Sequence, residues 1–366
     1  MSTKLRAGVV GAGVIGQVMH LHFLREMKDR FEIAAICDLS AAAGRACADE
    51  YAIPLVFTDW REMLSAPLDA VLVLISGSHA PVAVEASRAG LHVFVEKPMC
   101  FSAAEGLEMI AAADEAGKVL MVGYPKRYDP AFARFREEAA QLGSAKLLRV
   151  TTTESPFVPY VSHYPMFQAG DVSSDTLAPL IADSHRRLAA AIGTDDAFLV
   201  SQYSNVLLDT LVHEINTVRG ILGEPDSLDF VEMRPGALNA HLSFGDVAAA
   251  IHWVDTPKMT RYSMEFTMMA DDGRVTLSFP SPYLRNAPTA LAVEGGEAGG
   301  VSSYRRDEIT SYESGFKREL EVFYEAVTTG AAVPTSGADS LHDIAMCQSI
   351  IRYVQTGQAV ANPTQY

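Results

Sequence analysis

A glycine-rich turn near the N-terminus constrains the fold of this chain more than any other sequence feature. Gly11, Gly13 and Gly16 form a G-x-G-x-x-G pattern that directly follows a short apolar run and opens a helical pattern. In this position the first glycine permits a tight turn, the second lets the backbone approach a pyrophosphate, and the third allows close packing of the helix on the strand. The pattern therefore predicts a strand, a phosphate-binding loop and a helix in succession.

Short apolar runs alternate with helical patterns over the first third of the sequence. The expected strands are residues 7–10, 33–37, 56–57, 70–75, 92–95 and 120–122. The expected helices between them are residues 14–27, 41–51, 60–64, 81–89 and 103–116. This alternation is typical of parallel strands joined by crossover helices. We therefore predict an α/β fold whose N-terminal domain, residues 1–123, is a Rossmann domain with a doubly wound parallel sheet.

Beyond residue 124 the hydrophobic pattern changes to a period of two. The segments with this pattern are residues 146–153, 238–244, 249–254, 263–269 and 275–279. Helical patterns cover residues 130–142, 207–222, 312–328 and 339–356. Strands that alternate in this way have one covered face and one face open to water. We predict an α+β domain over residues 124–366 with a large open, mainly antiparallel sheet, whose C-terminal helices could pack back on the first domain.

The charge balance and the cysteines exclude several classes of protein. The sequence has 29 basic and 45 acidic residues, a net charge of −16, and its basic residues form no local cluster. Such a surface repels phosphate backbones, so nucleic acids and anionic membranes are poor partners. The 4 cysteines are scattered without a C-x-x-C spacing, which predicts core residues and no metal site. With no signal-peptide pattern and no uncharged apolar run of about 18 residues, we expect a cytoplasmic protein.

The choice of cofactor depends on Asp38. This residue ends the second expected strand, about 20 residues after Gly16, where a carboxylate can accept hydrogen bonds from the ribose hydroxyls of an adenosine. The same carboxylate would repel a 2′-phosphate, so NAD is favoured over NADP. Arg45, on the following helix, would weaken this preference if it turned toward the ribose.

The other expected cofactor contacts lie in the glycine turn and after two later strands. They are Gly11, Gly13, Val14, Ile15, Gly16, Ser76, His79, Glu96 and Lys97. Ligands of an open α/β sheet bind beyond the carboxyl ends of the strands, which is where these residues fall. For His79, a role as a helix-start residue without a ligand stays open.

Four motifs together resemble the glucose–fructose oxidoreductase / inositol dehydrogenase / rhizopine catabolism (Gfo/Idh/MocA) family. They are the glycine turn, Asp38, the E-K-P of residues 96–98 and the G-Y-P-K-R-Y-D-P of residues 123–130. The resemblance implies that Lys97, Asp209 and His213 meet at the substrate hydroxyl. Their implied roles are alkoxide stabilisation by the lysine, orientation by the aspartate and general base catalysis by the histidine. By themselves, Asp209 and His213 could also form a structural i, i+4 pair on one helix face.

The same resemblance implies an NAD-dependent oxidoreductase that reversibly converts a secondary ring hydroxyl of a sugar, cyclitol or glycoside into a ketone. The expected substrate contacts are Lys126, Arg127, Tyr160, His163 and Asn216. Asn216 stands where the family usually has Asp, and Lys126 stands where it has the first of two arginines. Two alternatives stay open: a redox-neutral NAD-dependent glycosidase or lyase of the same family, and a catalytically silent NAD-binding sensor. The family also implies a homodimer or homotetramer built through the C-terminal sheet.

Residues 155–200 form a longer segment than this family typically needs. Residues 157–167 are rich in aromatic side chains, which stack on sugar faces, and residues 175–192 have the pattern of an added helix. We expect this segment to serve either as a substrate-facing lid or as a subunit contact.

Overall fold

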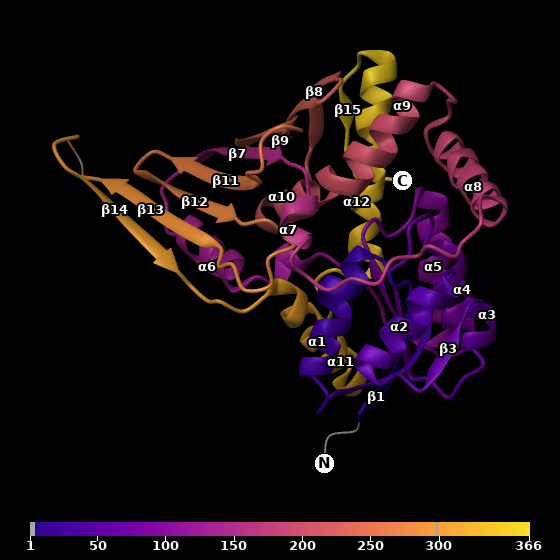
Figure 1. Cartoon of the computed structure of the whole chain (residues 1–366). Coiled ribbons are helices and arrows are strands. Elements are labelled where there is room, and N and C mark those ends of the chain that lie inside the picture. The colour runs from indigo at the N-terminus through magenta and orange to yellow at the C-terminus, as the bar shows by residue number, and fades with distance from the viewer. Residues whose placement is uncertain (1–3, 298) are drawn as a thin grey trace. The chain divides into compact units, whose positions relative to one another are not determined.

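The computed structural model of the chain describes residues 4–297 and 299–366 (Figure 1). The chain forms two compact units, each assembled from separate segments. The first unit runs up to Tyr124 and adds Tyr164–Asp209 and Glu319–Ile344. The second unit contains Pro125–His163, Thr210–Arg318 and Ala345–Tyr366. A parallel sheet lies in the first unit and a mixed sheet in the second.

Among the described residues, the first sheet has six parallel strands in the order β3-β2-β1-β4-β5-β6. They are β1 (Leu5–Val10), β2 (Phe31–Cys37), β3 (Leu55–Phe57), β4 (Ala70–Val73), β5 (His92–Glu96) and β6 (Leu120–Gly123). The predicted doubly wound sheet is confirmed. Its central strands are continuous runs of buried residues, as expected where both faces are covered. The strand order reverses between β1 and β4, so the fold binds ligands beyond the carboxyl ends of the strands at that point.

Five α-helices of the described chain lie between these strands. They are α1 (Leu21–Glu26), α2 (Ala41–Tyr51), α3 (Trp60–Met63), α4 (Ala80–Arg88) and α5 (Ala103–Ala116). Three of them, α2, α3 and α5, begin at a residue whose side chain caps the helix. The side chains of Ser40 and Ser102 accept main-chain N–H groups in the first turns of α2 and α5, which satisfies donors that a helix start leaves open. The helix expected at residues 14–27 is present, but after Val14 and Ile15 it contains a π-helical turn, η1 (Gly16–His20), that precedes α1.

The helix expected within residues 155–200 is present. α8 spans Ser174–Ile192, beginning at a Ser173 cap and ending at Gly193, which has a left-handed backbone. The short helix α7 (Val158–Val161) precedes it, and α9 (Ala197–Gln202) follows it.

The helix expected at residues 207–222 starts differently from the prediction. Its first part, η3 (Tyr203–Leu211), is π-helical, and α10 (Val212–Leu222) is α-helical. Asp209 therefore lies in a π-helix and His213 in an α-helix. Because π-helical hydrogen bonds join residues i and i+5, the face argument for a regular α-helix does not apply to this pair.

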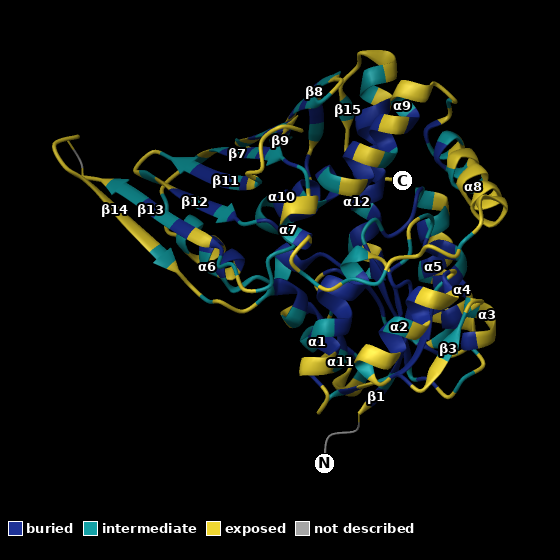
Figure 2. Cartoon of the chain, viewed as in Figure 1, coloured by how far each residue is buried: buried dark blue, intermediate teal, exposed yellow. Residues whose placement is uncertain are grey.

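Among the described residues, the second sheet has nine strands in the order β14-β13-β12-β11-β7-β10-β9-β8-β15. They are β7 (Ala145–Glu154), β8 (Ser227–Arg234), β9 (Ala237–Phe244), β10 (Val247–Asp255), β11 (Ser263–Ala270), β12 (Gly273–Phe279), β13 (Ala290–Gly296), β14 (Ser303–Ile309) and β15 (Val360–Ala361). In the described part of the chain, β7 pairs with β10 in parallel and the other pairs are antiparallel, which confirms the mainly antiparallel sheet. The sequence pattern missed β8, β13, β14 and β15. For β14 the reason is plain in Figure 2, because this edge strand is exposed along nearly its whole length and has no buried face to set a period of two.

The remaining helices include both that were expected at the C-terminus. They are η2 (Pro125–Tyr128), α6 (Pro130–Ala139), α11 (Gly315–Thr329) and α12 (Gly337–Thr356). α6 packs against β12 and β13 and so covers part of one face of the second sheet. All 4 cysteines are buried, as expected. In the described chain no helix is long and apolar enough to cross a membrane.

Candidate functional site

The three glycines of the turn after β1 have different surroundings. Gly11 has a φ of +106°, and a Cβ there would lie 2.8 Å from the main-chain carbonyl of Leu74. A Cβ on Gly16 would lie 2.9 Å from the carbonyl oxygen of Gly11. A Cβ on Gly13 would meet no described protein atom within 4 Å. The first and third glycines thus serve internal packing, whereas Gly13 leaves open the space where a pyrophosphate would approach the backbone, so the loop fits a dinucleotide.

The carboxylate of Asp38 is held beside this turn by two main-chain groups. Its Oδ2 accepts the N–H of Ala12 at 2.7 Å, and its Oδ1 accepts the N–H of Ser40 at 2.8 Å. The residue is half-buried. Because each carboxylate oxygen can accept about two hydrogen bonds, Asp38 keeps the capacity to bind ribose hydroxyls. Val14 and Ile15 are also half-buried, at the start of η1.

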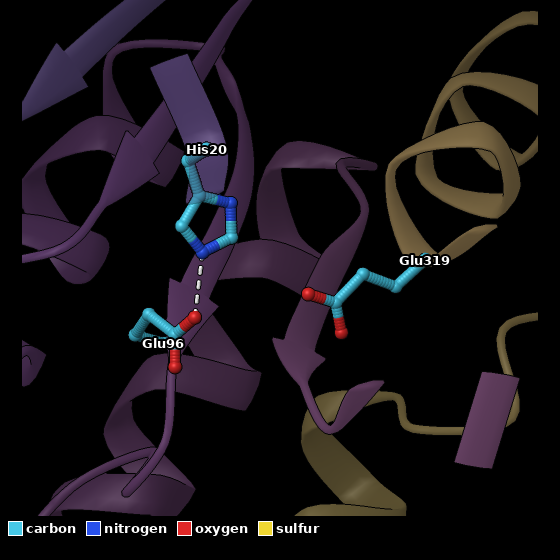
Figure 3. Close-up of side chains that lie close together, drawn as sticks. All are labelled: His20, Glu96 and Glu319. Carbon is cyan, nitrogen blue, oxygen red and sulfur yellow. Dashed lines mark hydrogen bonds and ion pairs between the residues drawn. The ribbon is translucent and has the colours of Figure 1, made fainter. Parts of the chain in front are cut away.

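Glu96 is the last residue of β5. Its side chain contacts both η1, the helical turn that follows the glycine turn, and the main chain of Lys97. Its Oε1 lies 2.6 Å from His20 Nε2 (Figure 3), and its Oε2 accepts the Lys97 N–H at 3.1 Å. Glu319 of α11 faces the same buried region, and ligand atoms of His20, Glu96 and Glu319 lie within 4.8 Å of one another. The sequence analysis predicted no metal site. Among the described residues, these three side chains are close enough together to hold a metal ion, so metal binding to them would test that prediction.

The side chain of Lys97 reaches η3. Its Nζ donates hydrogen bonds to Asp209 Oδ1 at 2.9 Å and to the main-chain oxygen of Asp209 at 2.5 Å. Both residues belong to the first unit, and the lysine lies beyond the carboxyl end of β5, where this fold binds ligands. Two of the three expected catalytic residues are therefore together. His213 belongs to the second unit, and its meeting with Lys97 stays a prediction.

The sequence reasoning missed Glu214, the neighbour of His213. Glu214 is fully buried and accepts a hydrogen bond from Thr152 Oγ1 at 2.6 Å. Burial raises the pKa of this carboxyl, against the opposing effects of the Thr152 hydroxyl and the Lys126 ammonium. Lys126, an expected substrate contact, is itself buried near this carboxyl. The sequence feature that could have indicated Glu214 is the presence of a glutamate within the strongly apolar run of residues 207–222.

Arg127 and Asn216 meet within the second unit. The Arg127 guanidinium donates to the main-chain oxygen of Asn216 at 3.0 Å, and a Cβ on Gly220 would lie 2.5 Å from Arg127 Nε. Asn216 is fully buried. The contact observed for these two expected substrate-binding residues is therefore the packing of η2 on α10.

Tyr160 and His163 lie on the aromatic segment that follows β7. The Tyr160 hydroxyl donates to the carbonyl of Thr260 at 3.2 Å and accepts the N–H of Tyr262 at 2.8 Å. These bonds fix the loop between β10 and β11 to the aromatic segment. His163 is exposed.

Ser76 and His79 follow β4, as expected for the edge of the cofactor site. Ser76 is exposed. His79 is buried, its Nε2 lies 2.8 Å from the carbonyl oxygen of Ile75, and burial lowers the pKa of its imidazole. A neutral imidazole that donates this bond holds the turn after β4 in shape.

Comparison with known proteins shows which proteins this chain resembles. Residues 5–124 match the family model described as an oxidoreductase family with an NAD-binding Rossmann fold. Inositol 2-dehydrogenase 3 of Saccharopolyspora erythraea is 25% identical over 367 residues, which cover 97% of this chain and 95% of that protein. The uncharacterized oxidoreductase YrbE of Bacillus subtilis is 33% identical over 167 residues. Residues 5–124, about a third of the chain, thus resemble the NAD-binding part of the Gfo/Idh/MocA oxidoreductases.

The match to the family model lies in the N-terminal third of the chain. The alignment with YrbE covers 44% of this chain and spans 48% of YrbE, so it reaches about half of that relative. The crystal structure of an aldose-aldose oxidoreductase from Caulobacter crescentus complexed with glycerol has a TM-score of 0.72 and 22% identity, and the match covers 98% of this chain and 100% of that one. This last likeness establishes the shared fold over nearly the whole length.

The chain also has a segment that crosses the glycine turn, outside the part matched by the family model. We call residues 164–171 the crossing segment. The Gln17 amide donates to the carbonyl oxygen of Phe167 at 2.8 Å and accepts the Phe167 N–H at 2.8 Å, and its Nε2 also donates to the carbonyl oxygen of Ala12 at 2.6 Å. The sequence reasoning missed Gln17, because its partner lies 150 residues away in the chain.

Proposed function

We propose that this protein is an NAD-dependent dehydrogenase that oxidises a secondary ring hydroxyl of a sugar, cyclitol or glycoside to a ketone. The observation that carries the proposal is the pairing of Lys97 with Asp209 beyond the carboxyl end of β5, in the same compact unit as the glycine turn. A cation donor at that edge of the sheet lies where the fold binds its ligands. The inositol dehydrogenase in the comparison supports a polyol as substrate.

In this proposal the three polar side chains divide the work on the substrate hydroxyl. Lys97 donates a hydrogen bond to the substrate oxygen and stabilises the negative charge that develops there. His213 accepts the hydroxyl proton, because the usual pKa of imidazole is close to neutral pH. Asp209 orients the Lys97 ammonium, to which it is already bonded. When bound, the nicotinamide of NAD supplies the acceptor for the hydride that leaves the carbinol carbon.

NAD is the proposed cofactor, with NADP disfavoured. The support is the position of Asp38, which two main-chain N–H groups hold at the end of β2 with acceptor capacity left for ribose hydroxyls. A 2′-phosphate at that position would meet a carboxylate.

The test is a panel of sugars, cyclitols and glycosides offered to the purified protein with NAD⁺ or NADP⁺. We expect at least one polyol to give reduced nicotinamide, followed by its absorbance, and NAD⁺ to be the better acceptor. The Lys97→Ala protein should lose this turnover. A panel in which no alcohol reduces either cofactor, with cofactor binding intact, would contradict a dehydrogenase.

The crossing segment favours one second candidate. Its bonds to Gln17 hold it across the glycine turn, which would slow release of a bound dinucleotide. Such retention suits a redox-neutral enzyme that oxidises the substrate transiently to eliminate or hydrolyse a glycosidic bond. Product analysis separates the two candidates: net oxidation forms one reduced nicotinamide per ketone, whereas the redox-neutral reaction releases an aglycone without net reduction.

A further inference from the structure

Asp171, at the end of the crossing segment, binds the start of helix α2. Its Oδ1 accepts a hydrogen bond from the Ser40 hydroxyl, and its Oδ2 accepts the N–H of Ala42 at 3.0 Å. The Ala42 N–H is one of the main-chain donors that the first turn of a helix offers to an anion, and the Ser40 hydroxyl belongs to the N-cap residue of α2. The contact joins residues 131 positions apart in the sequence, so no local pattern could indicate it.

The same helix start lies beside the expected ribose site. Asp38 Oδ1 accepts the N–H of Ser40 at 2.8 Å, so the carboxylates of Asp38 and Asp171 both bind Ser40. A ribose held by Asp38 would direct a phosphate on its 2′ oxygen toward the residues that follow Asp38 in the chain. Those residues include Ser40 and Ala42, whose hydroxyl and N–H groups already donate hydrogen bonds to Asp171.

Asp171 is held in place from both sides of the crossing segment. On one side, the Gln17 amide binds both main-chain groups of Phe167. On the other side, α8 is attached through Arg187, which donates to Glu105 Oε1 at 2.8 Å. The Ser40 hydroxyl and the main-chain N–H groups lower the pKa of Asp171, so this residue is a carboxylate at neutral pH.

We propose that Asp171 is a specificity-determining residue of the dinucleotide site, which excludes NADP by occupying the donors that a 2′-phosphate would need. The inference rests on the proposed function, because it concerns the cofactor of that enzyme. In this proposal two carboxylates disfavour the 2′-phosphate of NADP. Asp38 binds the ribose hydroxyls, and Asp171 occupies the neighbouring hydrogen-bond donors and adds a negative charge beside them.

The experiment measures binding directly by isothermal titration calorimetry, without turnover. The ligands are NAD⁺, NADP⁺, AMP and adenosine 2′,5′-bisphosphate; the last two report the 2′-phosphate alone. The proteins are the wild type, Asp171→Asn, and Asp171→Ser as a second variant in case the first folds poorly. Asp175→Asn is the matched control, because Asp175 is an exposed carboxylate in the first turn of α8, four residues further along.

We expect the wild type to bind NAD⁺ about a hundredfold more tightly than NADP⁺. Asp171→Asn or Asp171→Ser should tighten the binding of NADP⁺ and of adenosine 2′,5′-bisphosphate about tenfold and change that of NAD⁺ and AMP less than about threefold. Asp175→Asn should leave all four affinities unchanged. Wild-type binding of both dinucleotides with equal affinity, or a gain in NADP⁺ affinity no larger than in the Asp175 control, would overturn the inference while leaving the proposed function intact. Failure of every protein to bind NAD⁺ would instead overturn the proposed function, and the inference with it.

Discussion

At the scale of single residues, the Lys97 and Asp209 pair serves geometry more than stability. The two side chains lie 2.9 Å apart, but they are 18% and 67% exposed. An ion pair this open to water contributes about 1 kcal/mol or less to folding. Its effect is to hold the ammonium at one place beyond the end of β5, where the substrate oxygen is proposed to lie. Loss of the lysine should therefore affect turnover far more than folding.

Replacing Lys97 by alanine should lower kcat about 100- to 1,000-fold, because a preorganised donor to the developing charge is lost. The unfolding free energy should change by about 1 kcal/mol or less, and NAD⁺ should still bind, because the glycine turn and Asp38 are unchanged. Steady-state kinetics, urea unfolding and calorimetry measure these quantities. Lys28→Ala, at an exposed lysine after α1, is the control that should match the wild type. Turnover within about threefold of the wild type would remove Lys97 from the proposed chemistry.

Glu214 should make stability depend on pH in a direction unusual for a carboxyl group. Burial raises its pKa in the folded protein above the unfolded value near 4.5, so the folded state retains a proton that the unfolded state has lost. Its contribution to stability is complete below the unfolded pKa and declines as the pH rises through the folded pKa.

The Glu214→Gln variant should therefore lose less unfolding free energy than the wild type as the pH is raised from about 4.5 toward neutrality, by up to about 1.4 kcal/mol per pH unit. Urea unfolding at a series of pH values measures this slope. Glu313→Gln, at an exposed carboxyl group, is the control and should follow the wild type. Parallel curves for Glu214→Gln and the wild type would show that the carboxyl titrates normally.

At the scale of elements, the turn between β1 and η1 contains glycines that are needed for two different reasons. Gly11 is required by the backbone conformation and Gly13 by the expected ligand, and the sequence motif alone does not distinguish them. Gly11 is needed because of its positive φ and the nearby carbonyl of Leu74, whereas Gly13 faces open space. The first requirement belongs to folding and the second to the ligand. The two functions can therefore be separated by one added methyl group at each position.

Gly11→Ala should destabilise the fold by about 1–3 kcal/mol, because alanine is strained at a φ of +106° and its Cβ would meet the Leu74 backbone at 2.8 Å. Gly13→Ala should change stability by about 0.5 kcal/mol or less and weaken NAD⁺ binding at least about tenfold. Thermal unfolding and calorimetry on both variants give the four numbers. Equal loss of stability in the two variants would mean that Gly13 is also a folding residue.

Both π-helical segments carry residues of the proposed site. η1 begins at Gly16 and carries Gln17 and His20, and η3 carries Asp209. π-helical turns are rare and are frequent at functional sites, which agrees with this placement. Their cause is tertiary: hydrophobic periodicity predicts a helix at both places, and the sequence alone gave no indication of the wider turn.

At the scale of the whole molecule, one polar face of the second sheet stands out. Arg149 pairs with Glu265 at 2.9 Å across β7 and β11, and Arg274 pairs with Glu294 at 2.5 Å across β12 and β13. These side chains line a hollow of about 330 Å³ on the sheet. We propose that this face forms the subunit contact of a homodimer or homotetramer, because ordered charge pairs on a sheet face suit a self-complementary interface.

Light scattering coupled to gel filtration should then give two or four times the chain mass of 39.5 kDa. Arg274→Glu should shift the protein toward monomer, because it places like charges at the centre of the face. Lys258→Glu makes the same charge change in the exposed loop before β11 and should leave the mass unchanged. A wild-type monomer at micromolar concentration would contradict the proposal.

The first sheet, the glycine turn and the position of Asp38 could be predicted from the amino-acid sequence, because each depends on a short run of neighbouring residues. The sequence also indicated that Lys97 follows β5, at the ligand-binding edge. The second sheet was predicted less completely, because edge strands such as β14 have no buried face to impose a pattern. The added helix α8 was visible for the opposite reason, since its cap and its period are local.

Which distant groups meet could be seen only in the folded chain. The contact of Asp171 with Ser40, the hold of Gln17 on Phe167 and the assignment of Tyr164–Asp209 to the first unit join segments more than a hundred residues apart. The burial of Glu214, which sets its proton affinity, likewise depends on packing. Local periodicity records which residues avoid water, but a pair of polar groups from remote segments leaves no periodic signal. Motifs in the sequence therefore indicated part of this site, and contacts that exist only after folding supply the rest.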